Sequence, residues 1–401
     1  MHGTKWNLLA LSALIVAAPA VAAEELKTAF ADTDYSVNWR VRYENVDQAN
    51  LAEEANALTS RVRAGFTSGA IGDTKLLAEM VGVSSLRSDY NSTINGNTQF
   101  PVVADPDGIA MINRFALINN SLENTRLTLG RQRLILDDAR FVGNVGWRQN
   151  EQTFDGLSSH TEGNNFTFDA AWFNQANRIF GPDSPNGEWE GDIVLLNASR
   201  NFGFGKLTAF AYGMDFDQAL GASNETIGLR LTGSKALGDT SLIYTFSAAS
   251  QSDAGDNPAD YSEMYTKIEG GVTHGSLTVA LGQEVLGGDG SNAFVTPLAT
   301  LHAFQGWGDK FLGTPSGGIV DSYLRFAYSF GLTGAFDSVS LSGFYHDFEA
   351  DLGSATYGDE LDLSLAARAG RVTLTLKYAS YDADTFSVDT DKLWVSMDYA
   401  F

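Results

Sequence analysis

The sequence contains no cysteine and only 8 prolines, and its 26 lysines and arginines are outnumbered by 49 aspartates and glutamates. The lack of cysteine excludes disulfides, thiolate metal sites and cysteine nucleophiles. A formal net charge of −23 is the opposite of the basic footprint that nucleic-acid-binding proteins need. After the first twenty-odd residues, no apolar run is long enough to cross a bilayer as a helix.

The N-terminus has the pattern of an export signal. Leu8–Ala18 forms an apolar core of about 11 residues, and Ala20–Ala22 fits the small-x-small motif that precedes a cleavage site. We expect cleavage after Ala22. Residues 1–22 are then a signal peptide, and residues 23–401 are the mature protein.

Most of the remaining chain alternates apolar and polar residues with the period of two that is typical of β-strands. The last strand, Lys392–Phe401, is rich in aromatic residues and ends the chain at Phe401. In a closed barrel the last strand pairs with the first, so nothing trails beyond it. This ending resembles the C-terminal signal that bacterial outer-membrane barrels present to their assembly machinery. We predict about 18 strands: Ser36–Asn45, Leu58–Ser68, Thr74–Val83, Asn113–Asn119, Thr125–Leu134, Trp147–Ser158, Phe166–Ala176, Ile193–Phe202, Lys206–Phe216, Thr226–Ala236, Thr240–Ser250, Tyr261–Thr273, Ser276–Leu286, Ile319–Gly331, Ser338–Glu349, Glu360–Ala369, Arg371–Tyr381 and Lys392–Phe401.

The connections between these strands alternate in length. Short turns such as Gly203–Gly205 alternate with long polar segments such as Ser84–Ile112 and Gly287–Gly318. An outer-membrane barrel has this asymmetry, whereas a soluble sandwich has no reason to sort its loops. We therefore predict an all-β fold, a single antiparallel transmembrane β-barrel with short periplasmic turns and long extracellular loops.

Two blocks of sequence resemble a known family. The first comprises Gly130-Arg131-Gln132, Asp137–Gly143, Trp147–Asn150 and Thr153–Gly156, and the second is Pro297–Phe311. Both are similar to the alginate-export family of outer-membrane barrels. The resemblance implies a monomeric pore of about 18 strands that passes an anionic polysaccharide such as alginate.

The polar faces of the clearest strands carry many cations. A lipid-facing arginine costs roughly 2–4 kcal/mol at the membrane midplane, so these side chains are expected to face the lumen. Arginine binds carboxylates bidentately, which suits a uronate chain. Ordinary lumen filling, in which each arginine pairs with a neighbouring acid, remains open. The predicted pore-lining cations are Arg40, Arg42, Arg61, Arg63, Lys75, Arg114, Arg126, Arg230, Lys267, Arg325, Arg368 and Lys377; the predicted inward acids are Glu44, Glu79, Asp169, Glu269, Glu284, Asp321, Asp362 and Asp398.

The loop Ile135–Gly146 is a candidate constriction. It is flanked by arginines that would line the pore if the loop folds inward, and that would otherwise pair at the rim with Asp137 and Asp138. The candidates in and around this loop are Arg131, Arg133, Asp137, Asp138, Arg140, Arg148 and Asp155.

Other chemistry finds little support. His346-Asp347 resembles a protease pair without a third member, His160 and His274 fall in predicted short turns, and there is no phosphate-binding glycine loop. We predict no catalysis, cofactor, metal or nucleic-acid partner. The leading hypothesis is an outer-membrane channel for anionic solutes or acidic saccharides, in contact with membrane lipid and lipopolysaccharide. A non-selective general porin is the main alternative, followed by a barrel enzyme and a non-conducting adhesion barrel.

Overall fold

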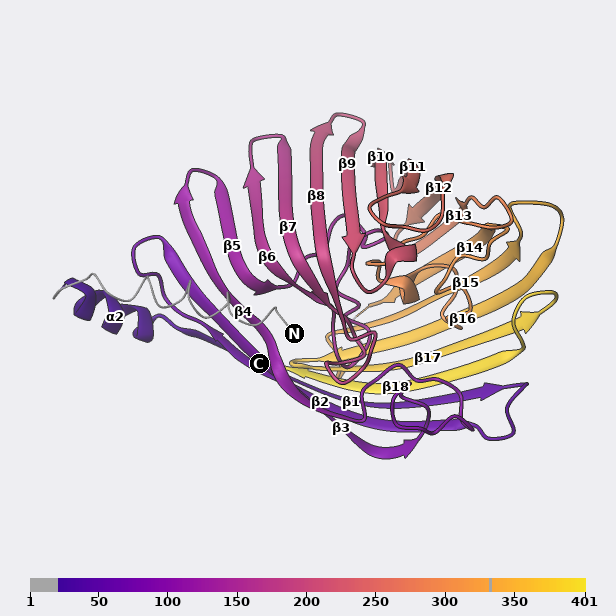
Figure 1. The fold of residues 1–401 in the computed structure, drawn as a ribbon, viewed down its shortest axis with the longest axis horizontal. Helices are drawn as coiled ribbons and strands as arrows, with labels where there is room; N and C mark the ends of the chain where they lie inside the picture. Colours follow the sequence, from indigo (N-terminus) through magenta and orange to yellow (C-terminus); the bar gives the residue numbers. More distant parts are fainter. Residues whose placement is uncertain (1–20, 332–333) are drawn as a thin grey trace.

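The computed structural model describes residues 21–331 and 334–401, and 18 strands within them form one closed antiparallel sheet (Figure 1). The sheet closes because β1 (Asp34–Gln48) pairs both with β2 (Ala55–Thr67) and with β18 (Thr390–Ala400). At this seam Val37 and Phe401 exchange two backbone hydrogen bonds. The predicted fold class and the pairing of the last strand with the first are confirmed.

The other strands follow in chain order, each beside its sequence neighbours. They are β3 (Thr74–Asp89), β4 (Gly108–Leu122), β5 (Thr125–Gln132), β6 (Thr153–Glu162), β7 (Phe166–Asn177), β8 (Glu188–Phe202), β9 (Gly205–Phe216), β10 (Asn224–Leu237), β11 (Thr240–Asp253), β12 (Ser262–His274), β13 (Leu277–Leu286), β14 (Ile319–Phe330), β15 (Ser338–Glu349), β16 (Thr356–Ala369) and β17 (Val372–Ala383). Single-turn 3₁₀ helices η1 (Leu220–Ala222) and η2 (Leu301–Ala303) lie in loops.

Several predicted boundaries were wrong. The predicted strand Trp147–Ser158 begins only at Thr153, because the polar residues before it bond to loop residues and to the inner wall, and not to a neighbouring strand of the sheet ladder. Gln152, for example, donates from its side chain to the carbonyls of Gly143 and Leu298. The structure also extends β4 and β8 toward the long loops, through residues 108–112 and 188–192.

The two faces of the wall differ as a membrane barrel requires. On β1 and β2, Trp39 and Val62 are more than 40% exposed, whereas Arg42 and Arg61, on the opposite face, are 2% exposed or less. Lipid-facing and lumen-facing residues alternate along such strands. The exposed apolar face is therefore the outer one, and the buried arginines point inward.

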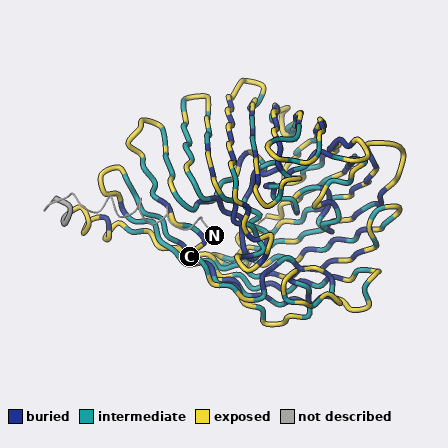
Figure 2. The backbone as a smooth tube through the Cα atoms, viewed as in Figure 1, coloured by how far each residue is buried: buried dark blue, intermediate teal, exposed yellow. Residues whose placement is uncertain are grey.

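Two long connections fill the interior, where buried residues concentrate (Figure 2). The first inner loop, residues 133–152, joins β5 to β6, and the second inner loop, residues 287–318, joins β13 to β14. Val142 and Leu298 form a parallel bridge between the two loops. The larger apolar cluster of the described residues therefore lies inside the barrel, between the loops and wall residues of strands from β6 to β17.

The helix α2 (Val21–Ala31) precedes the first strand and lies at one end of the molecule (Figure 1). Its Ala29 carbonyl accepts hydrogen bonds from the Gly69 N–H and the Thr33 hydroxyl. The predicted signal peptide lies outside the described residues apart from Val21 and Ala22. In the part of the chain that the structure describes, no helix is long and apolar enough to span a membrane.

Candidate functional site: the lumen and its two inner loops

Four arginines form a basic wall on the inner face of β1 and β2. Arg40 is paired in register with Arg61 across the two strands, and Arg42 and Arg63 lie beside them. Arg40 bonds to the Asp398 carboxylate of β18 at 2.7 Å. Arg61 lies farther from the same carboxylate, at 3.7 Å. Arg42 and Arg61 are buried with guanidinium nitrogens that have no hydrogen-bond partner. Such burial of positive charge is costly unless other groups compensate it.

The first inner loop covers this basic wall. Arg40 donates to the backbone carbonyls of Gly146 and Trp147, and Gln149 donates to the Thr59 hydroxyl of β2 at 2.8 Å. The Arg42 guanidinium stacks on the Trp147 ring at 3.9 Å. The loop thus lies inside the barrel, as the constriction hypothesis requires.

Glu151, at the end of the first inner loop, joins the loop to the wall by charge. Its buried carboxylate accepts a hydrogen bond from Arg133 at 2.8 Å and pairs with Arg63 of β2 at 3.3 Å. Burial opposes ionisation, but the hydrogen bond from Arg133 and the charges of Arg63 and Arg133 lower the pKa of Glu151 to about 2. Glu151 is therefore ionised at neutral pH.

Arg140 crosses from the first inner loop to the opposite wall. It is 1% exposed and pairs with Glu284 of β13 at 2.9 Å. Its other nitrogens donate to Thr296 and Gln305 of the second inner loop, each at 3.1 Å. The Arg140 guanidinium thus connects the first inner loop both to the second inner loop and to β13.

Arg148 stands at the centre of a second network. It pairs with Glu44 of β1 at 3.1 Å and with Asp309 of the second inner loop at 3.0 Å. Asp309 also accepts from Lys392 of β18 at 2.9 Å and from His302 at 2.8 Å. Burial would raise the pKa of Asp309, but Lys392, His302 and Arg148 together hold it well below its usual range. The carboxylate is therefore locked in its charged form.

His302 is neutral and bridges two groups. Burial, followed by the charge of Lys377, lowers the pKa of His302 to about 3. Its Nδ1–H donates to Asp309, and its Nε2 accepts from Lys377 of β17 at 2.6 Å. The imidazole stacks on Trp147 with 4.6 Å between centroids and 6° between planes. One ring therefore connects both inner loops to β17.

The tip of the second inner loop is held by its backbone. The N–H groups of Trp307 and Gly308 donate to Asp362 and Glu360 of β16 at 3.0 and 2.6 Å. Gly306 has a φ of +79°, and a Cβ there would come within 2.5 Å of the Glu360 carboxylate. Glycine at this position therefore permits the close approach.

Four other predicted lumen cations differ in what they contact. Arg114 pairs with Glu79 at 2.7 Å and Arg325 with Glu269 at 2.7 Å, so these lumen cations are neutralised locally. Lys267 lies over the Phe304 ring at 5.4 Å. In contrast, Arg126 has no hydrogen bond or ion pair within the described residues.

Arg131 and Asp155 were wrongly predicted to line the pore, and the alternative in which the loop's arginines pair with Asp137 and Asp138 is not formed among the described residues. Arg131 is paired in register with Phe115 and shares the face of the exposed Leu129, so it lies on the outer face, bound to Asp155 at 2.8 Å. Asp137 and Asp138, in turn, form no ion pair with the loop's own arginines among the described residues. Instead, Asp138 pairs with Arg230 at 2.8 Å, and Asp137 accepts from Asn197 at 2.7 Å.

Several residues that hold the inner loops to the wall were not predicted from the sequence. They are Trp147, Glu151, His302, Asp309, Glu360 and Lys392. Trp147, His302 and Asp309 lie within the two family-like blocks, and this was the only available signal. Glu360 and Lys392 follow the alternation of β16 and β18, which places both on the inner face.

His346 and Asp347 do not form the pair that a barrel enzyme at this position would need. Its Nδ1 bonds to Asp321 at 2.8 Å, whereas Asp347 follows it on the opposite, exposed face of β15. Across residues 21–331 and 334–401, no group of three or more histidine or acidic side chains is placed to hold a metal ion.

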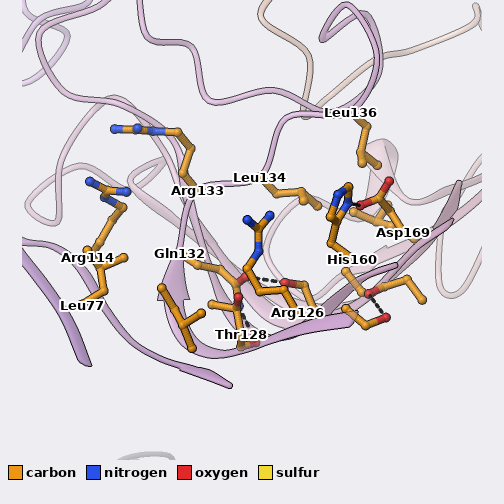
Figure 3. Close-up of a pocket in the computed structure, with 16 residues that line it drawn as sticks. Leu77, Arg114, Arg126, Thr128, Gln132, Arg133, Leu134, Leu136, His160 and Asp169 are labelled. Atoms are coloured by element: carbon orange, nitrogen blue, oxygen red, sulfur yellow. Dashed lines mark hydrogen bonds and ion pairs between the residues drawn. The ribbon is translucent and has the colours of Figure 1, made fainter. Parts of the chain in front are cut away.

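Below the first inner loop, on the periplasmic side, the lumen contains a pocket of about 290 Å³ (Figure 3). Arg114, Arg126 and Arg133 line one part of it, and the His160–Asp169 pair lines another. His160 lies in β6 and not in a turn as predicted.

Comparison with known proteins gives a family and a fold. A family model described as alginate export matches residues 30–257, more than half of the chain. The chain is similar to the solved structure of Pseudomonas aeruginosa OccK9 (OpdG), with 18% identity and a TM-score of 0.74 over 93% of this chain and 99% of that one. It is also similar to Acinetobacter baumannii OccAB3, with 14% identity and a TM-score of 0.73 over 92% and 99% of the two chains. A third similar structure is Pseudomonas aeruginosa OpdK, solved with vanillate. It has 17% identity and a TM-score of 0.72 over 93% of this chain and 99% of that one. At these identities the structures establish a shared fold alone. The comparison with curated proteins returned no match.

Proposed function

This chain belongs to the alginate-export family of outer-membrane barrels, and on that premise we propose that it is a passive channel for anionic solutes, acidic saccharides included. The observation that carries the proposal is the basic wall of Arg40, Arg42, Arg61 and Arg63. Lys377 and Lys392 of neighbouring strands extend this wall around the seam of the barrel. Once the first inner loop leaves the wall, several spaced guanidiniums would bind carboxylates weakly and repeatedly, which favours passage over retention.

The two inner loops set the width of the path. They are fastened to the wall by Arg140, Arg148 and Glu151, so the described conformation is narrowed at their level. Small anions would pass beside the loops. An acidic polymer would require the loops to leave the basic wall, which would then face the polymer directly.

A non-selective porin is the second candidate, because many lumen cations are paired. Arg40, Arg114 and Arg325 each lie within 2.7 Å of a carboxylate. Such pairs leave little net charge along the path.

Export and assembly complete the proposal. Residues 1–22 would direct the chain across the inner membrane, and the last strand with Phe401 would engage the barrel-assembly machinery. The mature barrel would function as a monomer among outer-membrane lipids and lipopolysaccharide.

The test is the reversal potential of the purified protein in planar bilayers under a potassium chloride gradient. We expect a preference for chloride, and concentration-dependent block by oligouronates. No preference would favour the general porin. A cation preference that persists in an Asp137→Asn, Asp138→Asn double variant would contradict the proposal.

A further inference from the structure

The pocket on the periplasmic side of the first inner loop contains one free cation. Arg126 projects from β5 into the middle of the pocket (Figure 3) and forms no hydrogen bond or ion pair with any described residue. Its two cationic neighbours are already satisfied, Arg114 by Glu79 and Arg133 by Glu151. Arg126 is therefore the group in this pocket whose charge is left for a ligand.

The other polar groups of the pocket bind one another. Ser158 donates to the side-chain oxygen of Gln132, and Gln132 donates to the Thr128 carbonyl. His160 lies 2.6 Å from Asp169 through Nδ1 and 3.1 Å from Glu162 through Nε2. The carboxylate in the pocket is thus held by the imidazole, and no ion pair forms between it and Arg126.

The remaining lining is apolar and comes from two sources. Leu134 and Leu136 descend from the first inner loop, while Leu77, Ile118 and Leu195 project from β3, β4 and β8. Burying apolar area is worth about 25 cal/mol per Å², so a ligand that covers these side chains gains affinity from them. A ligand covered with hydroxyl groups would lose hydrogen bonds to water at the same surface.

We propose that this pocket is a binding site for a small amphipathic carboxylate, whose carboxylate pairs with Arg126 while its compact apolar body packs against Leu134 and Leu136. The inference rests on the proposed function, because it names a solute class for an anion-passing lumen. It goes further by locating a discrete site on the periplasmic side of the narrow region. A guanidinium binds a carboxylate through two parallel hydrogen bonds, so the site would orient its ligand as well as attract it.

The probe is benzoate, titrated by calorimetry into the detergent-solubilised full-length protein. We expect Arg126→Gln to lower benzoate affinity by at least about tenfold, and Arg126→Lys, which keeps the charge without the fork, to lower it less. The matched control is Arg368→Gln, which removes an inner-face cation near the periplasmic end of β16 on another part of the wall. We expect it to change affinity by less than about twofold.

Ligand comparison tests the apolar contribution. Acetate, which lacks the apolar body, and glucuronate, which carries hydroxyls, should both bind more weakly than benzoate. Equal or tighter binding of either would overturn the proposal, as would equal losses in the Arg126 and Arg368 variants. Heat-modified migration on gels would verify that each variant forms a barrel. Chloride preference without benzoate binding would refute this site alone, whereas loss of chloride preference in the unmodified protein would refute the proposed function.

Discussion

Two sides of the lumen hold the inner loops by different forces. At the seam formed by β1, β17 and β18, the contacts are charged and directional, as in the chain from Glu44 through Arg148 to Asp309. On the side formed by β7 to β10, the loops also pack on apolar rings, as where Phe141 meets Phe210 with 4.9 Å between centroids, beside the ion pair of Asp138 with Arg230. Charged contacts need exact geometry and respond to pH, whereas apolar packing is non-directional. The loops are therefore held mainly by a charged network at the seam, and by apolar packing together with the Asp138–Arg230 pair on the other side.

The largest effect is expected from Arg148→Ala, which breaks the charged side at its centre. Removing one partner of a buried pair typically costs about 3–5 kcal/mol, because here Glu44 and Asp309 would remain buried without it. We expect looser loops, a higher single-channel conductance and faster proteolysis within residues 133–152.

Arg131→Ala is the matched control for that variant. It also removes an arginine from a close pair with a carboxylate, but on the outer face and away from the inner loops. Its cost should be at most about 1 kcal/mol, with unchanged conductance. Equal effects of the two substitutions would show that the loops are not held by the charged network.

Phe141→Ala probes the apolar side and should have an intermediate effect. A fully buried phenylalanine costs roughly 3–5 kcal/mol to truncate, and because Phe141 is only partly buried we expect about 2–3 kcal/mol. Conductance should rise by a similar factor at neutral and at acidic pH, since no titrating group is removed. Phe204→Ala, at an exposed periplasmic turn, is the control. A strongly pH-dependent effect of Phe141→Ala would contradict the proposed division between the two sides.

Acidification should loosen the charged side by a smaller, graded amount. In the docked loops the pKa of His302 is about 3, whereas an exposed imidazole has a pKa of 6.5. Between these values His302 is protonated when the loops are undocked and neutral when they are docked. Docking therefore weakens as the pH falls from 6.5 toward 3. Glu151 adds a second step in the same direction, between its ordinary value of 4.5 and about 2. Conductance recorded across this range should rise.

His302→Gln separates the two steps. The amide cannot titrate, so the increase below pH 6.5 should be absent in this variant while the step due to Glu151 remains. A conductance that falls on acidification would contradict this pH dependence of loop docking.

The wall could be predicted from the sequence, because a strand in a membrane barrel must alternate locally. That rule placed Arg40, Arg61 and Arg126 on the inner face. It also places Arg131 on the outer face, where the structure has it, although the family-like block predicts this arginine in the pore. The sorting of short turns from long loops was predictable for the same local reason.

The interior could not be predicted in the same way. Arg148 meets Glu44 and Asp309 across separations of 104 and 161 residues, and no local period encodes such contacts. Trp147 to Gln152 looked like the start of a strand because polar residues in a loop and at a strand end are alike in sequence. Their partners, such as Asp105 for the Gln149 N–H, become visible only when the barrel is closed.

The seam where the first and last strands join also carries the anchor of the loops. Glu44 belongs to β1, Lys377 to β17 and Lys392 to β18, and Arg148, His302 and Asp309 connect all three. These partners lie close together only after β18 has paired with β1. The complete anchor, with Lys377 and Lys392 in place, therefore forms only in the closed barrel, so full docking of both loops indicates that the barrel has closed.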